Sequence, residues 1–486
     1  MLKNKQTNLK WKRTKILILF ATLAIISGCG VFGGDKASNK EGEEKVSTLP
    51  LEVTRYDGEK SKTIDSIYTA NKVLALTFNG MGDESMVKQL LDELDLYGIK
   101  ATFFLPGMRV AEEPELAKEI LSRGHEIENN TLNRLDMNEL SYEEIYKEIQ
   151  LSNEVIKRET GVTPRYLRTK SGEYNDDVRL VTAQLGMDAV ISYNINPKDG
   201  DMKDAKAIGK YVEKYIKRGG IVSLNTDINP EVVKSIAYIS KAAEDINYKF
   251  IPLSKLIEQE IEKKPFNEIE GYDAVKINED YENSVSEVYR KAKTDKKVVS
   301  LTFDDWASDK TITNVLDILA KYDIKATFFL IGNGVEKNPN LARAILEEGH
   351  EVASHSYNHK VVTEMTPEDL QEDLKKAHEV LTEAIQQKPT MLFRPATGSV
   401  DEPTAKVIAA AGYPEVALYD VTAFDWDVNN SAEDIVQSVM DKTTTGSVIL
   451  LHILDDKHTI EALPIIIENL KGKGYEFIKM TELMNM

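Results

Sequence analysis

The stretch IKATFFLPG at residues 99–107 returns almost unchanged as IKATFFLIG at residues 324–332. The same offset of 225 residues aligns two further pairs of segments. They are VLALTFNG (73–80) with VVSLTFDD (298–305), and LAKEILSRGHEIENNT (116–131) with LARAILEEGHEVASHS (341–356). Self-similarity at a nearly fixed offset indicates a repeated structural unit. The sequence therefore predicts two copies of one domain.

The repeat also sets the domain boundaries. Towards the end of each copy the offset drifts to 227, where YKFIPLSKL (248–256) matches YEFIKMTEL (475–483). We place the first copy at residues 67–258 and the second at residues 294–486. Residues 259–293 are charged and broken by Pro and Gly, which predicts a connector.

Within each copy, short β-rich runs alternate with stretches whose apolar residues recur at helical spacing. VVSLTF, for example, is followed by TITNVLDILAKYD. This alternation predicts an α/β fold with a parallel sheet, either an open layer or a barrel. In both forms the chemistry gathers at the carboxyl ends of the strands. The polar residues that follow the apolar runs are therefore the candidate functional residues.

In the second copy these positions carry reactive side chains. They are Asp304-Asp305, His355 with His359, Arg394-Pro395, Asp425-Trp426 and Leu451-His452. Adjacent carboxylates on an extended chain point in different directions, so the two Asp residues can take different roles. Two His residues four positions apart can reach one ion. Each motif alone is common on protein surfaces, so the signal lies in their order and spacing together.

The second copy carries, in this order, the motifs TFDD, HSxxH, RP, DW and LxH. This pattern resembles that of the NodB-type polysaccharide deacetylases of carbohydrate esterase family 4. The resemblance covers the whole second copy. It implies two tandem NodB-like distorted (β/α) barrel domains. It also implies a metal-dependent hydrolase that removes acetyl groups from N-acetylhexosamine residues of a cell-wall or extracellular glycan. Peptidoglycan is the first expectation for the substrate, ahead of chitin-like oligomers, poly-N-acetylglucosamine and acetylated xylan.

The resemblance implies roles for the first of these residues. Asp305, His355 and His359 would hold a divalent metal ion. Zn²⁺ is the default for such ligands, and Co²⁺, Mn²⁺ or Ni²⁺ remain open. Asp304 would be the general base, which Arg394 would orient and keep ionised.

The remaining matched residues would complete the site. His452 would be the general acid, and Asp425 would orient it and favour its charged form. The residues expected to bind substrate are Trp306, Pro395, Trp426 and Leu451.

Two positions depart from the family pattern. Trp306 stands where the family usually has Gly, and Ala396-Thr397 stand where it has Pro and an aromatic residue. These exchanges leave open the alternative that the protein is a non-catalytic glycan-binding or wall-assembly lipoprotein. A cyclic-imide or urea amidohydrolase on the same fold is a third reading, which would not explain a lipid anchor. The enzyme is favoured, because a binding module has no need of a complete set of ligands, base and acid.

The first copy lacks most of these groups. Its residues at the positions of Asp304, Asp305, His355, His359 and His452 are Asn79, Gly80, Asn130, Arg134 and Asn225. Arg168 and Asp199 remain opposite Arg394 and Asp425. We therefore expect a degenerate domain that binds no metal.

Three further His residues need an interpretation. His350 has a counterpart, His125, in the copy without a site, so we expect it to be structural rather than a metal ligand. His378 and His458 match no motif, and we expect both at the surface.

The first 28 residues are typical of a secretory signal. Six Lys and Arg residues, with no acid, accompany an apolar run at residues 16–26 that ends in Ser27-Gly28-Cys29. Cys29 after Ile-Ser-Gly resembles a bacterial lipobox, which implies a lipid on Cys29 and cleavage before it. The alternative is an uncleaved anchor helix, and both place the body outside the cytoplasmic membrane. Residues 29–66 are expected to be a flexible tether.

The charge of the chain excludes several partners. Its formal net charge is -19, and removing the six basic residues of the signal leaves -25. Such an acidic body argues against binding to nucleic acid and against adsorption to an anionic membrane through a basic face. Cys29 is the only Cys, so the chain has no internal disulfide and no Cys-based zinc cluster.

Overall fold

The computed structural model of the chain describes residues 53–486. The predicted signal and Cys29 lie outside the described residues, as does most of the predicted tether. No helix within residues 53–486 has the length and apolar character needed to cross a membrane.

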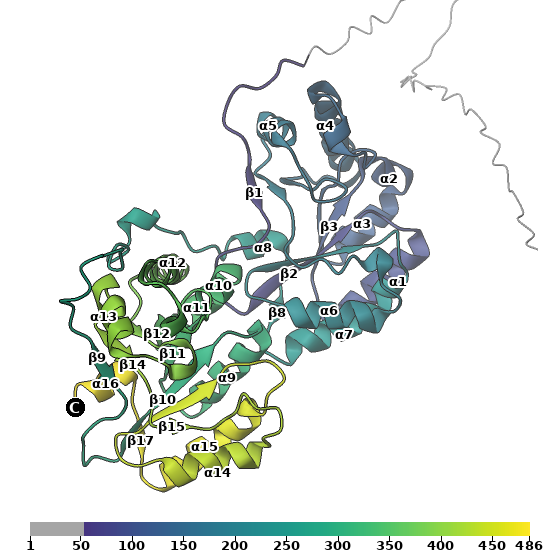
Figure 1. Ribbon diagram of the computed structural model, residues 1–486. Helices are drawn as coiled ribbons and strands as arrows, with labels where there is room; N and C mark the ends of the chain where they lie inside the picture. Colours follow the sequence, from purple (N-terminus) through teal and green to yellow (C-terminus); the bar gives the residue numbers. More distant parts are fainter. Residues whose placement is uncertain (1–52) are drawn as a thin grey trace, which may run out of the picture. The chain divides into compact units, whose positions relative to one another are not determined.

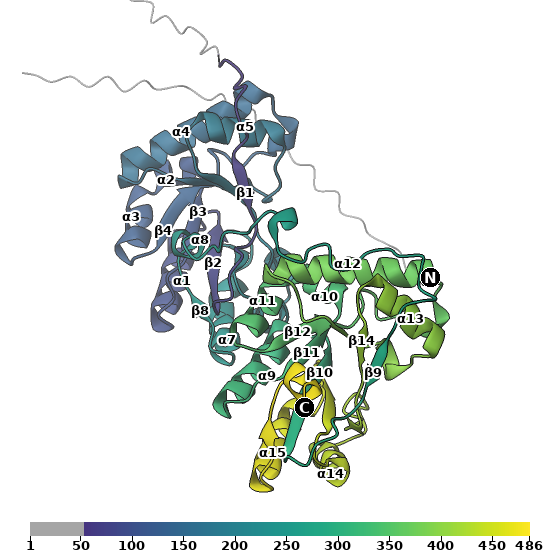
Figure 2. The ribbon, with the colours of Figure 1, turned by 90° about the vertical axis from the view of Figure 1, so that its left-hand side faces the viewer.

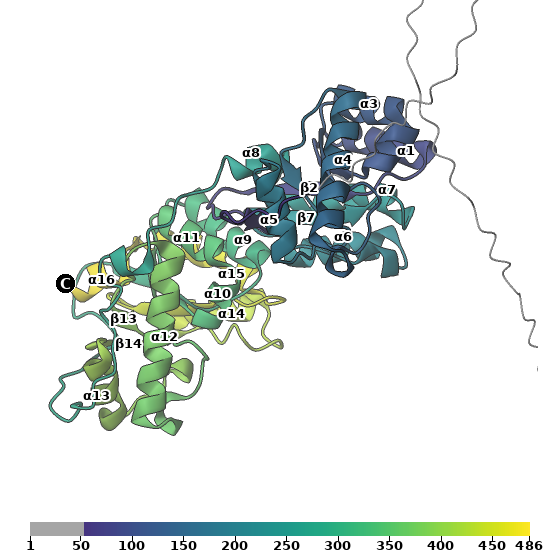
Figure 3. The same cartoon turned by 90° about the horizontal axis from the view of Figure 1, so that it is seen from above.

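The first copy is built on an eight-stranded sheet with the order β1-β6-β5-β4-β3-β2-β7, and β8 also pairs with β2. Its strands are β1 (Lys62–Ile64), β2 (Val73–Asn79), β3 (Thr102–Leu105), β4 (Glu126–Asn129), β5 (Tyr166–Leu167), β6 (Ala189–Ile191), β7 (Gly220–Asn225) and β8 (Lys249–Phe250). Its helices are α1 (Glu84–Leu96), α2 (Gly107–Glu112), α3 (Pro114–Ser122), α4 (Tyr142–Thr160), α5 (Asp176–Gln184), α6 (Ala205–Tyr215), α7 (Glu231–Glu244) and α8 (Leu253–Ile257). Helices α6 and α7 pack side by side (Figure 3).

The second copy repeats this arrangement in a nine-stranded sheet, with the order β15-β16-β10-β11-β12-β13-β14-β9 and β17 paired with β10. Its strands are β9 (Glu287–Tyr289), β10 (Val298–Asp305), β11 (Thr327–Leu330), β12 (Glu351–Ser354), β13 (Leu392–Phe393), β14 (Glu415–Ala417), β15 (Val421–Thr422), β16 (Val448–His452) and β17 (Glu476–Phe477). Its helices are α9 (Asp309–Lys321), α10 (Gly332–Lys337), α11 (Pro339–Glu347), α12 (Pro367–Ile385), α13 (Glu402–Ala411), α14 (Ala432–Lys442), α15 (Thr459–Gly472) and α16 (Met480–Met484). Helices α11 and α12 pack on each other and against β12 (Figure 2).

Strands and helices alternate along the chain, and the named strands of both sheets pair in parallel (Figure 1). The prediction of two tandem α/β domains is therefore confirmed. The sequence pattern left an open layer and a barrel undecided. Each sheet curls as a half-barrel, and in the first an isolated bridge joins Ser66, just after the end strand β1, to Gly220 of the opposite end strand β7. The fold is thus the expected distorted barrel.

Each sheet takes an edge strand from outside the range placed on its copy. β1 lies in the predicted tether and pairs with β6, and β9 lies in the predicted connector and pairs with β14. Both strands have only three residues, which is too short for a period-two pattern to stand out.

The His residues kept in both copies are structural, as predicted. His350 is buried, and its Nδ1 accepts a hydrogen bond from the Ala326 N–H at 3.1 Å. His125 accepts the same bond from Ala101. Burial lowers the pKa of His350 to about 3, so its ring is neutral.

Of the two His residues expected at the surface, His458 is exposed but His378 is not. His378 lies on α12 and is fully buried, with Nε2 at 2.8 Å from the Gly271 carbonyl oxygen. The prediction for His378 was wrong. It follows Leu374 by four positions and precedes Leu381 by three, so helical periodicity places all three on one buried face.

Candidate functional site

The candidate residues of the second copy come together at the carboxyl ends of its strands. Asp304 and Asp305 end β10, and His452 ends the neighbouring strand β16 in register with Asp304. His355 directly follows β12, and Arg394 directly follows β13. Parallel strands bring their carboxyl ends to one edge, which is why residues so far apart in sequence meet. Asp304, Asp305, His355 and His452 line a pocket of about 380 Å³, and Arg394 is buried behind it.

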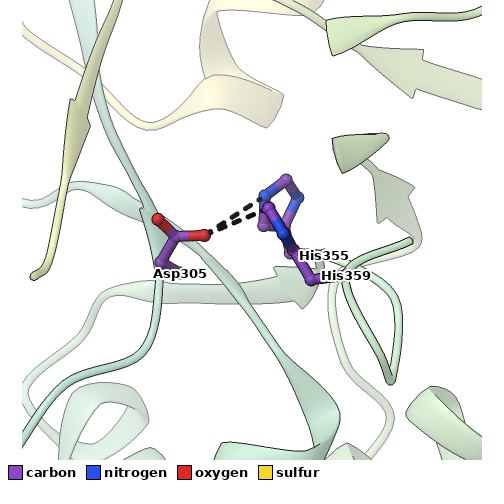
Figure 4. A group of neighbouring side chains, drawn as sticks. All are labelled: Asp305, His355 and His359. Atoms are coloured by element: carbon purple, nitrogen blue, oxygen red, sulfur yellow. Dashed lines mark ion pairs between the residues drawn. The ribbon is translucent and has the colours of Figure 1, made fainter. Parts of the chain in front are cut away.

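Asp305, His355 and His359 form a group suited to a metal ion (Figure 4). One potential ligand atom from each residue lies within 4.8 Å of the others. Asp305 Oδ1 is 3.7 Å from His355 Nε2 and 3.3 Å from His359 Nε2. Within residues 53–486 this is the one such group of three His, Cys, Asp or Glu side chains.

The chemistry of this group also fits a bound cation. Asp305 Oδ1 is buried and has no hydrogen-bond partner among the described residues. A buried carboxylate oxygen left unpaired is costly, and a cation would compensate it. Asp305 has φ +82°, in the left-handed region that few residues other than Gly adopt.

The tautomer of His355 is fixed by its environment. Its Nδ1 lies 2.7 Å from the Arg394 carbonyl oxygen, which can only accept a hydrogen bond. Nδ1 must therefore carry the proton, which leaves the lone pair of Nε2 facing Asp305. Burial lowers the pKa of His355, which favours the neutral ring that metal binding requires.

Arg394 fixes Asp304. The buried Arg394 guanidinium donates from Nη1 to Asp304 Oδ1 at 2.7 Å and to Thr302 Oγ1 at 2.9 Å. Its Nε donates to the Ala417 carbonyl at 2.8 Å, and Phe329 packs against its face. Asp304 Oδ2 then lies 3.8 Å from His355 Nε2, next to the metal group.

Asp425 fixes His452 in the same way. Asp425 Oδ1 accepts a hydrogen bond from His452 Nδ1 at 2.8 Å, so His452 Nε2 is the nitrogen free to act on a ligand. Asp425 Oδ2 accepts from the His452 backbone N–H and from the Thr459 hydroxyl. Burial lowers the pKa of His452, but the hydrogen bond and negative charge of Asp425 outweigh it, so the net pKa is raised.

The pocket wall differs in part from the prediction. Trp426 lines the pocket, but Trp306, Pro395 and Leu451 do not. Trp306 packs over Gly334, where an added Cβ would lie 2.3 Å from the indole Cγ. Leu451 is fully buried in the core.

The lining includes four residues that the sequence did not predict to bind substrate. They are Thr397, Gly398, Tyr419 and Leu450. Tyr419 could have been found from the repeat, since Tyr193 occupies the matching position in the first copy. Leu450 lies two positions before His452 on β16, and side chains two positions apart on a strand point to the same face. The prediction that His452 lies in the site therefore also indicates Leu450.

The equivalent positions of the first copy hold neutral amides and a guanidinium. Arg134, in the place of His359, has φ +55° where His359 has φ +54°, so both positions share the left-handed φ. Its guanidinium pairs with Asp227, and a Cβ added to Gly80 would lie 2.5 Å from Arg134 Nη1. A carboxylate at position 80 would therefore collide with Arg134 as it lies in this structure. Within residues 53–486 the first copy has no three-residue metal group.

Comparison with known proteins gives three findings. The sequence model of the family described as polysaccharide deacetylase matches residues 67–190 and 291–416, together more than half of the chain. The chain is similar to a peptidoglycan-N-acetylglucosamine deacetylase of Bacillus cereus, with 34% identity over 191 residues, 39% of this chain and 88% of that protein. It is similar to the enzyme of that name from Listeria monocytogenes, PgdA, with 35% identity over 193 residues, 40% of each chain.

Among solved structures, the chain is similar to a CE4 family pseudoenzyme from Bacillus anthracis. The identity is 30%, the match covers 42% of this chain and 70% of that one, and the TM-score is 0.39.

Proposed function

We propose, from the premise that this chain belongs to the polysaccharide deacetylase family, that its second copy is a metal-dependent N-deacetylase of peptidoglycan. Membership of the family makes the chain a hydrolase of amide bonds. The observation that carries the proposal is one pocket lined by the metal group, Asp304 and His452, in which the buried Arg394 pairs with Asp304 and the buried Asp425 pairs with His452. The printed names of the similar proteins support peptidoglycan N-acetylglucosamine as the substrate.

In this proposal the metal ion is held by Asp305, His355 and His359. A bound divalent ion supplies Lewis-acid polarisation of the acetamide carbonyl and lowers the pKa of a water molecule. The set of two imidazoles and one carboxylate suits Zn²⁺, and Co²⁺, Mn²⁺ or Ni²⁺ also accept these ligands.

The residues beside the metal group move the protons. Asp304 accepts a proton from the water that attacks the acetamide carbon, and the hydrogen bond from Arg394 holds its carboxylate in place. His452 donates a proton from Nε2 to the departing nitrogen as the C–N bond breaks, which releases a free amine and acetate. Asp425 keeps His452 charged and oriented for that step. Trp426, whose ring centroid is 5.2 Å from that of His452, forms the wall beside the acetyl group.

A panel of substrates tests the choice of glycan. Amine release per enzyme should be highest on peptidoglycan, lower on N-acetylglucosamine oligomers and poly-N-acetylglucosamine, and acetate release from acetylated xylan should be lowest. A clear preference for acetylated xylan would contradict the proposed substrate.

We further propose that the first copy is a degenerate domain. Asn79, Gly80, Asn130 and Asn225 supply no carboxylate or imidazole where the second copy has its base, two of its ligands and its acid. Asn side chains are weak ligands for borderline divalent ions, and Arg134 adds a positive charge. The chain should therefore bind one catalytic metal ion.

The pairing of His452 with Asp425 predicts a change in pH dependence. His452 must be protonated to act as the acid, so kcat/KM falls as the pH rises through its pKa. In Asp425→Asn the carboxylate that raises this pKa is gone and burial lowers it. The alkaline limb of the kcat/KM profile should therefore move to lower pH, with a lower maximum. Asp427→Asn, at an exposed carboxylate two positions away, should leave the limb in place. An unmoved limb in Asp425→Asn would remove His452 from the role of acid.

For residues outside the described structure, we propose that Cys29 carries a lipid and anchors the body to the outer face of the cytoplasmic membrane. Cys29→Ser should leave the signal uncleaved and the protein without lipid. Metabolic labelling with a fatty-acid analogue measures this, and equal label in the Ser variant and the parent would refute the anchor.

A further inference from the structure

The first copy has a pocket of its own that the proposed reaction does not use. It lies at the carboxyl ends of β2 and β7, where the second copy has its active site. Its volume is about 580 Å³, against about 380 Å³ for the pocket of the second copy. Both volumes fall in the range of about 300–1,000 Å³ that is usual for ligand sites.

The floor of this pocket is held in place by hydrogen bonds. Asn79 Nδ2 donates to Ser223 Oγ at 2.9 Å, and Asn79 Oδ1 accepts from Arg168. Asn225 Nδ2 donates to Asp199 Oδ1 at 2.8 Å. Asn130, which does not line the pocket, donates from Nδ2 to the Arg168 carbonyl at 2.8 Å. The groups that replaced the catalytic ones are therefore ordered, and a site with an ordered floor loses less entropy on binding.

One wall of the pocket is the same in both copies. Tyr193 stands over Gly172 in the first copy, as Tyr419 stands over Gly398 in the second. A Cβ added to either Gly would come within 3.0 Å of the ring or hydroxyl of its Tyr, and both Gly residues have positive φ. The two Tyr rings lie at 5.8 and 5.7 Å from the equivalent buried Arg side chains, Arg168 and Arg394. The first copy thus keeps the aromatic wall while lacking the reacting groups.

The lining of the pocket suits an uncharged polar ligand. Charged side chains of both signs occur in equal number: Arg134, Lys170, Lys198, Asp136, Glu173 and Asp201. Two apolar side chains at its rim are open to solvent, Leu135 at 45% and Ile228 at 57% exposed. Hydrogen-bonding groups beside exposed apolar faces match a sugar ring, which has hydroxyl and amide groups at its edge and C–H groups on its faces.

We infer that the pocket of the first copy binds a neutral segment of an N-acetylhexosamine polymer and holds it without cleaving it. The choice of sugar rests on the proposed function of the second copy. The absence of hydrolysis follows from Asn79, Gly80 and Asn225, which cannot serve as base, ligand or acid. The first copy then holds the polymer on which the second copy acts.

Titration calorimetry with a β-1,4-linked N-acetylglucosamine tetramer tests this inference. All proteins carry Asp304→Asn, which prevents turnover, and the double variant adds Leu135→Asp and Ile228→Asp at the rim. Both side chains are exposed, so the charges should not disturb folding, and the thermal unfolding midpoint checks this. The matched control is Leu96→Asp on α1, at a side chain that is 70% exposed and outside the pocket.

The double variant should bind one tetramer fewer per chain than its Asp304→Asn parent, and the Leu96→Asp control should bind as many as that parent. An equal number of sites in the double variant and its parent, including none in both, would overturn the inference. Amine release by the protein with Asp304 intact is measured separately. If that protein releases no amine, the proposed function is contradicted, but the predicted difference in the number of binding sites can still be measured.

Discussion

Asp304→Asn should lower kcat by roughly 10²–10⁴-fold, the usual contribution of a positioned general base. Asn at this position keeps the size of the side chain and can accept the Arg394 hydrogen bond, but it cannot take a proton from water. The three metal ligands are unchanged. We therefore expect the variant to keep its metal while it loses turnover, measured by elemental analysis and amine release on the same sample.

The first copy indicates why this variant should fold. There the buried Arg168 faces Asn79 rather than Asp, with Nη1 3.2 Å from Asn79 Oδ1. Arg168 also donates hydrogen bonds to the Thr77 hydroxyl and to the Ile191 and Ser192 carbonyl oxygens. These bonds are made even though burial lowers the pKa of the Arg168 guanidinium to about 9. Arg394 has the same kind of acceptors in Thr302, Ala417 and Leu418.

The control for this variant is Asp441→Asn at an exposed carboxylate on α14, which should retain the activity of the parent. Near-normal activity of Asp304→Asn would remove Asp304 from the role of base. Loss of metal together with activity would instead show that Asp304 belongs to the ligand set.

Removing one of the three metal ligands should have the second large effect, on metal binding. Asp305→Ala, His355→Ala and His359→Ala should each weaken metal retention by more than the roughly 10–100-fold that loss of an outer hydrogen-bond partner costs. The dialysed parent should hold close to one ion per chain, and each variant much less than one. His458→Ala, at an exposed His outside the site, is the control and should match the parent.

The same measurement of metal content tests the prediction that the degenerate first copy binds no metal. A reproducible ratio near two ions per chain would show that the first copy binds metal despite Gly80, Asn130 and Arg134. Full retention of the ion in His359→Ala would show that the ligand set is wrong.

Much of the fold was predictable because the chain repeats itself. The repeat of IKATFF and its neighbours predicts two copies of one domain, and the alternation of β-rich and helical runs within each copy predicts a parallel sheet. Parallel strands bring their polar ends to one edge. The sequence alone therefore predicts that Asp304, Asp305, His355 and His452 lie close together. β1 and β9 were missed because a strand of three residues derives its structure from the neighbour it pairs with, β6 or β14.

The pocket wall was harder to predict because it depends on pairs of residues far apart in sequence. Trp306 follows the two Asp residues directly and was expected to face the substrate. Its indole instead packs where Gly334 leaves room, and nothing near Trp306 in the sequence reveals that space. The prediction of an exposed His378 fails for a different reason. His378 belongs to no motif, and only the helical spacing of its apolar neighbours indicates that it lies on the buried face of α12.

The central claim is that the second copy hydrolyses the acetamide of a wall glycan with the help of a bound metal. Free-amine release from peptidoglycan by residues 30–486 tests it most directly, in samples stripped with a chelator and then reloaded with Zn²⁺, Co²⁺, Mn²⁺ or Ni²⁺. We predict negligible release by the stripped protein and steady release, with an equal amount of acetate, after reloading with at least one of these ions. No release by the protein after reloading with any of them would contradict the account, as would release that the chelator does not change.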